Sequence, residues 1–218
     1  HTLHEIVRKL PDGSSIQLNL EQVSSRLEVK AGRSRFSLAT LPREDFPIMA
    51  TSEYDSNFSI APDVLHRLFE KSRFAMSTEE TRYYLNGVYF HVATNLDGKV
   101  LRAVATDGHR LAQIDESIPD NFVEMPGVIV PRKTVGELRA ILESDDKSIS
   151  VSVSETKVRF LNSSITLTSK VIDGSFPDYT RVIPKDNNKK MEVAADYFAQ
   201  SVDRVSTISS ERARAVKL

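Results

Sequence analysis

Asp107 and His109 are the residues of this chain whose types and spacing come nearest to a catalytic pair. An aspartate can orient and polarise a neighbouring imidazole for general-base work, and both stand in the segment Ala105-Thr-Asp-Gly-His-Arg-Leu111. A hydrolytic site would also need a nucleophile, and the adjacent Thr106 would point to the opposite face of a strand. The segment therefore favours a turn, and a nucleic-acid-processing enzyme that uses Asp107 stays an alternative.

Other kinds of catalysis need motifs that the sequence lacks. There is no GxSxG elbow, HExxH, Walker loop or GxGxxG. The chain has 5 His without metal-ligand spacing and 0 Cys, which excludes disulfides, thiolate zinc sites and cysteine nucleophiles. The acidic pairs Glu79-Glu80 and Asp145-Asp146 are more typical of solvated loops than of a metal site. We therefore expect no catalytic residue, no metal and no cofactor.

The composition is typical of a globular protein without a membrane span. Hydrophobic residues make up 40% of the chain and its net charge is −1, and no apolar run approaches the roughly 18 residues of a spanning helix. A protein that grips DNA through phosphates is usually basic. DNA contacts, if present, should therefore be loose or confined to one face.

Period-2 alternation of apolar residues dominates the sequence and predicts a fold rich in strands. Strands are predicted near 15–21, 25–30, 35–41, 57–60, 84–93, 99–106, 109–115, 127–130, 148–153, 157–161, 164–170 and 179–183. Helices are predicted near 2–10, 62–76, 131–143 and 195–208. We expect an antiparallel α+β fold with its helices gathered on one face. Three of these helical segments carry a small excess of Lys and Arg, typical either of solvated faces or of a basic layer that attracts phosphates.

An internal repeat with a period of about 130 residues organises these elements. The stretch 3–46 has a helical apolar pattern and then three alternating runs, and 135–176 follows the same order. A shorter echo links Ile60-Ala-Pro62 with Ile129-Val-Pro131, so one period looks like two similar halves, each a strand, a helix and several strands. Chance similarity within an unrelated α+β protein is the alternative. Polar segments at 51–56 and 185–190 read as linkers.

Five short segments at this order and spacing closely resemble the β subunit of bacterial DNA polymerase III, the sliding-clamp family. They are Ser34-Arg-Phe-Ser-Leu38, Arg82-Tyr-Tyr-Leu-Asn-Gly87, Ala105-Thr-Asp-Gly-His-Arg-Leu111, Val130-Pro-Arg-Lys133 and Asp173-Gly-Ser-Phe-Pro-Asp-Tyr179. Each segment alone is a weak signal, and five in register are specific. The resemblance extends over essentially the whole chain.

The resemblance implies a DNA-clamp fold in a head-to-tail homodimeric ring. Family subunits have three similar domains, each of two like halves, with antiparallel sheets outside and paired helices on the inner face. By this mapping residues 1–50 are the second half of the first domain, 57–190 are the complete middle domain, and 191–218 open the third. The family's subunit interface joins first and third domains, so we expect the 218-residue chain to be a fragment that cannot close the ring.

The family binds polymerase subunits, the clamp loader and repair proteins through short linear motifs in a hydrophobic cleft. The resemblance carries this cleft onto Leu85, Thr106, Gly108, His109, Arg110, Leu111, Pro177, Arg181 and Val182. The apolar members would form the walls of a pocket, where peptide anchors gain binding energy, and the two arginines would meet polar or acidic motif residues. Leu111 and Val182, taken singly, could equally be ordinary core positions.

For contacts with double-stranded DNA, the resemblance points to a loop that carries two tyrosines and to basic residues on the inner helices. These residues are Arg73, Tyr83, Tyr84, Arg132 and Lys133, and the alternative is that the tyrosines are strand residues with one of them buried. The implied function is a non-catalytic, cytoplasmic bacterial processivity factor that surrounds duplex DNA without sequence specificity. A closed ring needs only weak contacts, which agrees with the near-neutral charge. A peptide-binding adaptor without a DNA role is the remaining alternative.

Overall fold

The computed structural model describes most of the chain, which divides into two compact units, His1–Asp173 and Gly174–Leu218. No helix among the described residues is long and apolar enough for a membrane crossing. The start of the predicted linker 51–56, the last residue of the predicted helix 131–143, Asp145 and most of 209–218 lie outside the description. The described residues are 1–21, 23–46, 53–120, 122, 124–142, 146–208 and 216.

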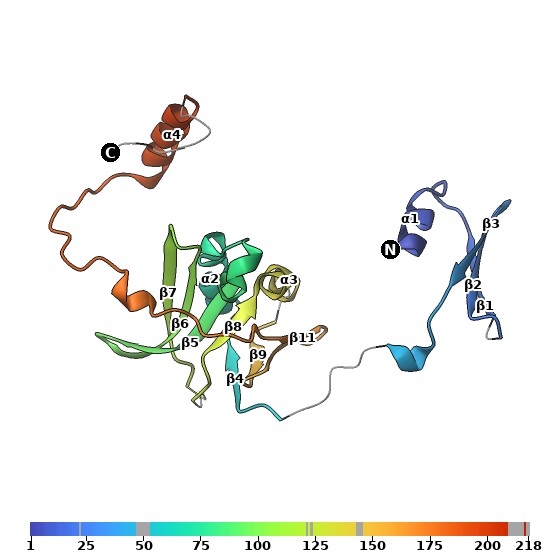
Figure 1. The fold of residues 1–218 in the computed structure, drawn as a ribbon, viewed down its shortest axis with the longest axis horizontal. Coiled ribbons are helices and arrows are strands. Elements are labelled where there is room, and N and C mark those ends of the chain that lie inside the picture. The colour runs from blue at the N-terminus through green and yellow to red at the C-terminus, as the bar shows by residue number, and fades with distance from the viewer. Residues whose placement is uncertain are drawn as a thin grey trace. The chain divides into compact units, whose positions relative to one another are not determined.

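The N-terminal segment is one helix followed by a three-stranded antiparallel sheet in the order β1-β2-β3 (Figure 1). Its elements are α1 (Thr2–Arg8), β1 (Ile16–Glu21), β2 (Arg26–Ala31), β3 (Ser34–Ala39) and the 3-10 turn η1 (Arg43–Asp45). Only Val29 and Ala31 are buried among the described residues of this segment. The helix and all three strands lie where the sequence predicted them, but they enclose almost no core.

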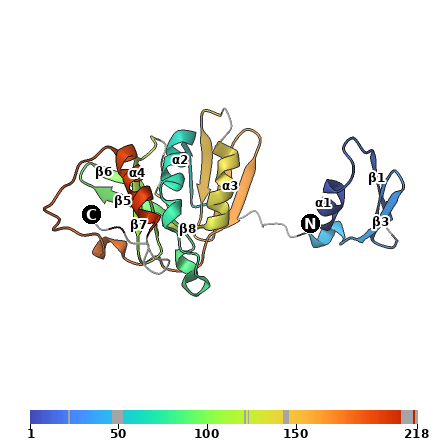
Figure 2. The same ribbon diagram turned by 90° about the horizontal axis from the view of Figure 1, so that it is seen from above.

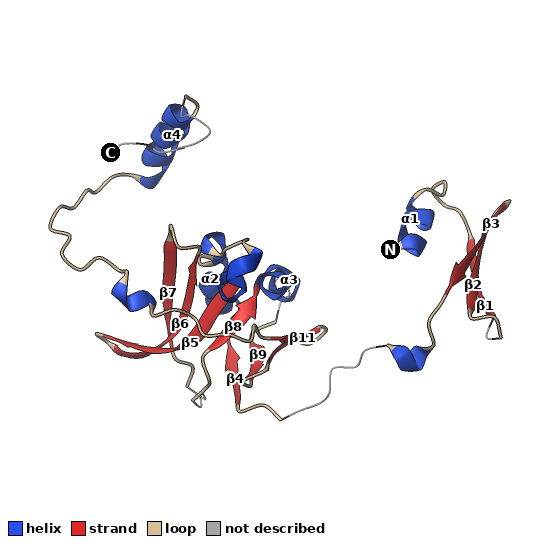
Figure 3. Ribbon diagram, viewed as in Figure 1, coloured by secondary structure: helices blue, strands red, loops and turns tan. Residues whose placement is uncertain are grey.

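The middle of the chain follows one order twice: a strand, a helix and three further strands. The first half contains β4 (Ser56–Ile60), α2 (Pro62–Glu70), β5 (Gly87–Asn95), β6 (Gly98–Thr106) and β7 (Leu111–Ser117). The second half contains β8 (Val128–Pro131), α3 (Arg132–Leu142), β9 (Ile149–Val153), β10 (Lys157–Leu161) and β11 (Thr166–Lys170). Figure 3 shows these helices and strands by colour. The predicted antiparallel α+β fold with two like halves is confirmed.

The two halves exchange their first strands, a feature that the sequence pattern did not reveal. The sheets have the orders β7-β6-β5-β8 and β11-β10-β9-β4, so β4 pairs with β9 of the second half and β8 pairs with β5 of the first. Phe58 stands opposite Val151, and Tyr89 stands opposite Ile129. All pairs are antiparallel. Neither half can therefore complete its sheet without the other.

One hydrophobic core joins both halves beneath the helices. Helices α2 and α3 lie side by side (Figure 2), with α2 against β6 and β7 and α3 against β5, β8, β10 and β11. The ring of Phe69 on α2 lies 5.5 Å from that of Phe90 on β5 and 6.1 Å from that of Phe160 on β10, centroid to centroid. Phe69 thus contacts the sheets of both halves.

Helix α2 is shorter than the predicted helix 62–76. It ends at Glu70, and Arg73–Ala75 form a separate 3-10 turn, η2. The hydroxyl of buried Ser72 donates to the carbonyl oxygens of Leu68 at 2.7 Å and Phe69 at 3.2 Å, and such bonds to the preceding turn compete with helix continuation. Arg73 therefore lies outside α2, and so does most of the positive charge predicted for this helix.

One predicted strand is wrong and another begins too early. The strand predicted at 84–93 is β5, which begins at Gly87, and Tyr83 and Tyr84 precede it in a 3-10 segment, η3 (Glu80–Leu85). The predicted strand 179–183 is the 3-10 turn η4 (Tyr179–Arg181), which the Asp178 side chain caps by accepting the backbone N–H of Thr180 at 3.2 Å. Short apolar runs do not distinguish such turns from strands. The second unit also holds α4 (Ala195–Ser206), which buries no residue.

Candidate functional site

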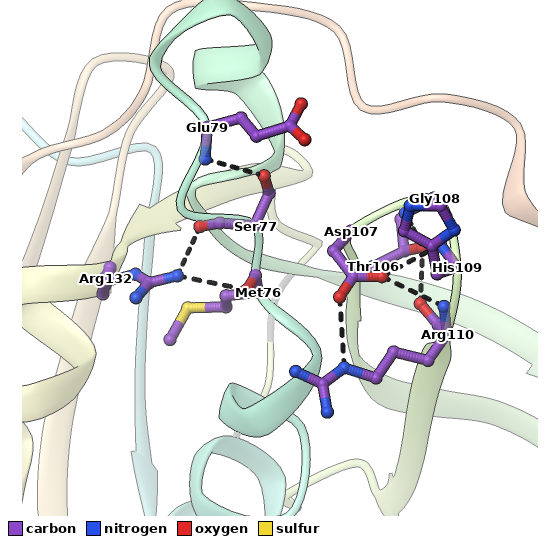
Figure 4. Close-up of polar contacts among 9 residues, drawn as sticks. All are labelled: Met76, Ser77, Glu79, Thr106, Asp107, Gly108, His109, Arg110 and Arg132. Atoms are coloured by element: carbon purple, nitrogen blue, oxygen red, sulfur yellow. Dashed lines mark hydrogen bonds and ion pairs between the residues drawn. The ribbon is translucent and has the colours of Figure 1, made fainter. Parts of the chain in front are cut away.

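The segment from Thr106 to Leu111 is a tight turn that its own side chains close. Thr106 and Leu111 form the last pair of the β6–β7 ladder. The Thr106 hydroxyl donates to the carbonyl oxygen of Arg110 at 2.7 Å and accepts the N–H of Gly108 at 3.1 Å (Figure 4). Gly108 has a φ of 89°, which favours glycine. These bonds fix the turn without any partner, so a ligand would meet a preformed surface.

The carboxylate of Asp107 is engaged by the turn and not by an imidazole. One oxygen accepts the backbone N–H groups of His109 at 2.9 Å and Arg110 at 3.0 Å, and the other accepts the Arg110 Nε–H at 3.1 Å. Partial burial opposes ionisation, but these hydrogen bonds and the guanidinium charge outweigh it and lower the pKa of Asp107. Asp107 and His109 are close together, as expected, but the contact is a hydrogen bond from the backbone N–H of His109 and not from its imidazole ring.

Arg110 is held at its Nε by Asp107 and lies over an aromatic ring. Its guanidinium carbon is 5.7 Å from the ring centroid of Phe74, which belongs to η2 and remains 57% exposed. Such a position favours a cation–π contact. Phe74 is not among the predicted site residues, because the sequence predicted a helix over 62–76 that would include it. The available signal was that Phe74 lies off the apolar stripe formed by Leu65, Leu68 and Phe69.

Leu85 and Leu111 differ from the exposed residues of the turn. Leu85 is 4% exposed, and the N–H of Ser77 donates to its carbonyl oxygen at 3.0 Å. Leu111 is half-buried, whereas Gly108, His109 and Arg110 are exposed. A Cβ at Gly108 would stand 2.9 Å from Nη1 of Arg82, so the segment before Leu85 reaches over the turn. The first unit therefore brings the predicted residues Thr106, Gly108, His109, Arg110 and Leu111 together at one end of the β6–β7 hairpin, with Arg82 of η3 beside them.

Pro177, Arg181 and Val182 lie in and around η4 of the second unit. Arg181 Nε is 2.8 Å from the carboxylate of Asp178, yet 84% of the Arg181 side chain is exposed. Hydrogen bonding from the Thr180 side chain and the Arg181 charge lower the pKa of Asp178. Val182 is 69% exposed. The nine predicted cleft residues are thus divided between two units, and their assembly into one cleft stays a prediction.

The three basic residues predicted to contact DNA have different surroundings. Nε of Arg73 forms an ion pair with Glu70 at 3.2 Å. Nη2 of Arg132 donates to the carbonyl oxygen of Met76 at 3.1 Å and to that of Ser77 (Figure 4). Lys133 is exposed, and its side-chain ammonium has no ion-pair or hydrogen-bond partner among the described residues. Arg132 therefore supports the loop at 76–77, and Lys133 is the better placed of the two for a phosphate.

The two tyrosines of η3 are arranged edge to face. Their ring centroids are 5.8 Å apart, with Tyr83 53% exposed and Tyr84 half-buried. The segment is fixed behind them, because Asn86 Nδ2 donates to the carbonyl oxygen of Glu79 at 3.1 Å. A Cβ at Gly87 would stand 2.4 Å from the carbonyl oxygen of Val130, so this strand start requires glycine. The exposed ring of Tyr83 is a surface on which a base or sugar could pack.

Across the described part of the chain, no group of three or more His, Cys, Asp or Glu side chains is arranged to hold a metal ion.

Comparisons with known proteins point to a single family. The central-domain model of the DNA polymerase III beta subunit matches residues 59–178, and the N-terminal-domain model matches residues 1–50. The beta sliding clamp of Caulobacter vibrioides is 53% identical over the whole chain, which spans 59% of that protein's length. The beta sliding clamp of Escherichia coli K12 is 40% identical over 98% of the chain and 57% of its own length.

Solved structures agree with this result. A sliding clamp from Bartonella birtlesii bound to griselimycin has a TM-score of 0.82 and 48% identity, covering 98% of this chain and 57% of that one. The Caulobacter crescentus clamp with polyethylene glycol bound to a putative β-motif tethering region has a TM-score of 0.84 and 53% identity, covering 97% and 56%. The chain thus spans less than two thirds of each relative.

Proposed function

This chain belongs to the DNA polymerase III beta subunit family, the bacterial sliding clamps, and from that premise we propose that its protein surrounds duplex DNA and tethers polymerases to it. The role is non-catalytic: it requires a closed ring and a docking surface. We place the protein in the bacterial cytoplasm, as a homodimeric ring in its full-length form. Polymerase subunits, the clamp loader and repair proteins are its proposed partners.

The preformed turn at Thr106–Leu111 is the observation that carries the docking proposal. Its backbone is closed by Thr106 and Asp107, while Gly108, His109 and Arg110 stay exposed. A rigid surface of this kind loses little conformational entropy when a peptide binds. The Bartonella birtlesii relative is bound to griselimycin, which supports ligand capture by clamps of this fold. We propose that Arg181 of η4 and the adjacent Val182, both exposed, also contact the bound peptide.

The proposed DNA role depends on a few exposed side chains and not on a strongly basic surface. Arg73 is paired with Glu70 and Arg132 is bonded to carbonyl groups, so the exposed charge and ring available for DNA are those of Lys133 and Tyr83. Such weak contacts permit sliding, because a ring retains the duplex by topology and not by affinity. The full-length ring, loaded on circular duplex DNA, should be released when the DNA is cut. An adaptor without a DNA role would bind peptides and fail to remain on the circle.

Fluorescence titration with a labelled peptide that carries a Gln and a Leu-Phe anchor tests the docking surface. We expect Leu111→Asp and Arg181→Glu, each made in the full-length chain, to weaken binding at least about tenfold. Leu96→Asp is the matched control, because Leu96 lies at the fully exposed β5–β6 hairpin tip. Unchanged affinity in both cleft variants would remove the proposed docking site.

A further inference from the structure

The guanidinium of Arg110 is restrained on two sides and open on a third. Asp107 accepts its Nε–H at 3.1 Å, and its carbon lies 5.7 Å from the centroid of the Phe74 ring. Its Nη1 and Nη2 groups have no hydrogen-bond partner within the described part of the chain. The side chain is 59% exposed. The edge that can donate two parallel hydrogen bonds is therefore free, while the remainder of the group is fixed.

Asp107 cannot easily follow a moving arginine. Its other oxygen accepts the N–H groups of His109 and Arg110, and the N–H of Asp107 donates to the Arg110 carbonyl oxygen at 3.4 Å. Rotation of the carboxylate would break both backbone bonds of the turn. The aspartate thus anchors the Nε side of Arg110 to the β6–β7 hairpin.

Phe74 is equally restrained although its ring is exposed. Its neighbours Ala75 and Met76 are buried, and η2 packs against β6 and β7. The N–H of Met76 donates to the carbonyl oxygen of Arg73 at 3.2 Å and closes the turn around Phe74. The ring is therefore presented by a rigid segment. Its exposed side chain gains little from burial, which points to a role in supporting Arg110.

We propose that Asp107 and Phe74 are positioning residues for partner docking. Asp107 holds the Nε edge of Arg110 and Phe74 supports the face of its guanidinium, so that the Nη groups can donate hydrogen bonds to an uncharged carbonyl oxygen of the bound peptide. This inference rests on the proposed docking function and adds two residues outside its predicted cleft. An uncharged acceptor is favoured because the Asp107 carboxylate already balances the guanidinium and would repel a second carboxylate. Pre-orientation removes the cost of ordering a flexible arginine at the moment of binding.

A double-mutant cycle in the full-length chain tests this role with the labelled peptide. We expect Arg110→Ala to weaken binding about tenfold or more and Phe74→Leu about threefold. In the Arg110→Ala background, Phe74→Leu should cause no further loss, because the ring acts only through the arginine. Phe74→Tyr should restore affinity to within about 1.5-fold, since tyrosine keeps the aromatic face. Leu96→Ala controls for loss of an exposed apolar side chain elsewhere.

Two further arms complete the design. Asp107→Asn keeps an oxygen for the two backbone N–H groups but removes the charge, and should weaken binding in the wild-type background and not in Arg110→Ala. A peptide series with Gln or Glu at each polar position should show no position where Glu binds better than Gln by more than about threefold. Thermal unfolding of each variant confirms that the fold is kept.

The outcomes separate the two proposals. Equal losses from Phe74→Leu with and without Arg110, or a Phe74→Tyr variant as weak as Phe74→Leu, would overturn the positioning role. Binding that depends on Leu111 and Arg181 but ignores Arg110 would leave the docking site standing and end this inference. A wild-type chain that captures no peptide would remove both.

Discussion

The N-terminal segment and the second half of the middle domain have the same order of elements but very different interiors. We call the part of the chain from β4 to β11, residues 56–170, the middle domain, because the family's central-domain model matches most of it. The N-terminal segment and this second half both contain a helix and three antiparallel strands, α1-β1-β2-β3 and α3-β9-β10-β11. Val151 is 0% exposed, whereas Leu18, which matches it in the repeat, is 58% exposed. The sequence pattern is similar in the two regions, so the difference arises from what each region packs against.

Strand exchange explains this contrast. In the middle domain β4 from the other half pairs with β9, and α2 adds Phe69 above the joint core. In the described N-terminal residues β1 pairs only with β2. With these contacts alone, the described residues of the N-terminal segment bury only Val29 and Ala31. In the middle part of the chain, two halves therefore build one core together, and the N-terminal segment has no such partner among the described residues.

Removal of the Phe69 ring should have the largest effect, because it should destabilise the middle domain and leave the N-terminal segment unchanged. Phe69→Ala deletes a side chain that is 2% exposed and contacts both halves, so we expect a loss of about 3–5 kcal/mol in the unfolding free energy of the middle domain. Because the halves share one core, hydrogen exchange should rise in both sheets together. The exchange of β1, β2 and β3 should not change. Faster exchange confined to β5, β6 and β7 would show that the halves are independent.

A matched pair of isoleucine substitutions sharpens the comparison at one position of the repeat. Ile149 begins β9 and is 0% exposed, and Ile16 begins β1 and is half-buried. Ile149→Ala should destabilise the middle domain by about 2–5 kcal/mol, and Ile16→Ala should cost about 1 kcal/mol or less. Urea unfolding followed by circular dichroism measures both. Similar losses would mean that the N-terminal segment has a core comparable with that of the middle domain.

The order of helices and strands could be predicted from the sequence because it depends on the local periodicity of apolar residues. The alternation through Ile149, Val151 and Val153 indicates a strand with one buried face. It does not indicate which neighbour the strand pairs with, so the exchange of β4 and β8 could not be predicted. Pairing between distant strands is decided by the whole fold and not by the pattern of either strand.

Site residues show the same limit. The turn at Thr106–Leu111 was predictable because Asp107-Gly108 is a turn signal and Thr106 and Asp107 cap it locally. The bonds from Arg132 to the carbonyls of Met76 and Ser77 join segments far apart in sequence, and a basic residue type alone suggested DNA. Phe74 was missed for the related reason that its partner Arg110 lies on another hairpin.

Lowering the pH should destabilise the two regions over different pH ranges, and this effect should be smaller than those of the core substitutions. In the middle domain, burial and the nearby charge of Arg102 lower the pKa of His91, although a hydrogen bond to the Val92 carbonyl and Asp115 oppose this. The unfolded chain then takes up the proton first, so stability falls as pH drops below about 6.5 toward the folded-state pKa. His91→Gln should flatten this part of the profile. An unchanged profile would show that His91 is not the responsible group.

The N-terminal segment should respond only in stronger acid. Ion pairs with Lys30 and Arg35 lower the pKa of Glu28, so the stabilisation is present at neutral pH and is lost as pH falls through the folded-state pKa of this carboxylate. Hydrogen exchange of β2 measured against pH, with Glu28→Gln as the control, tests this order. Destabilisation of β2 that begins together with that of the middle domain would contradict it.

The smallest expected effect is a gain of stability at Gly136 in α3. Glycine weakens a helix interior, and a Cβ at this exposed position would meet no atom within 4 Å. Gly136→Ala should therefore stabilise the middle domain by about 0.5–1 kcal/mol, measured by urea unfolding. His4 of α1 matches Gly136 in the repeat and is also exposed, so His4→Ala should raise only the helicity of α1. It has no described core through which to act on the middle domain. A Gly136→Ala variant that raised the helicity of α3 without changing the unfolding free energy of the middle domain would show that α3 stabilises the domain through its packing and not through its helix propensity.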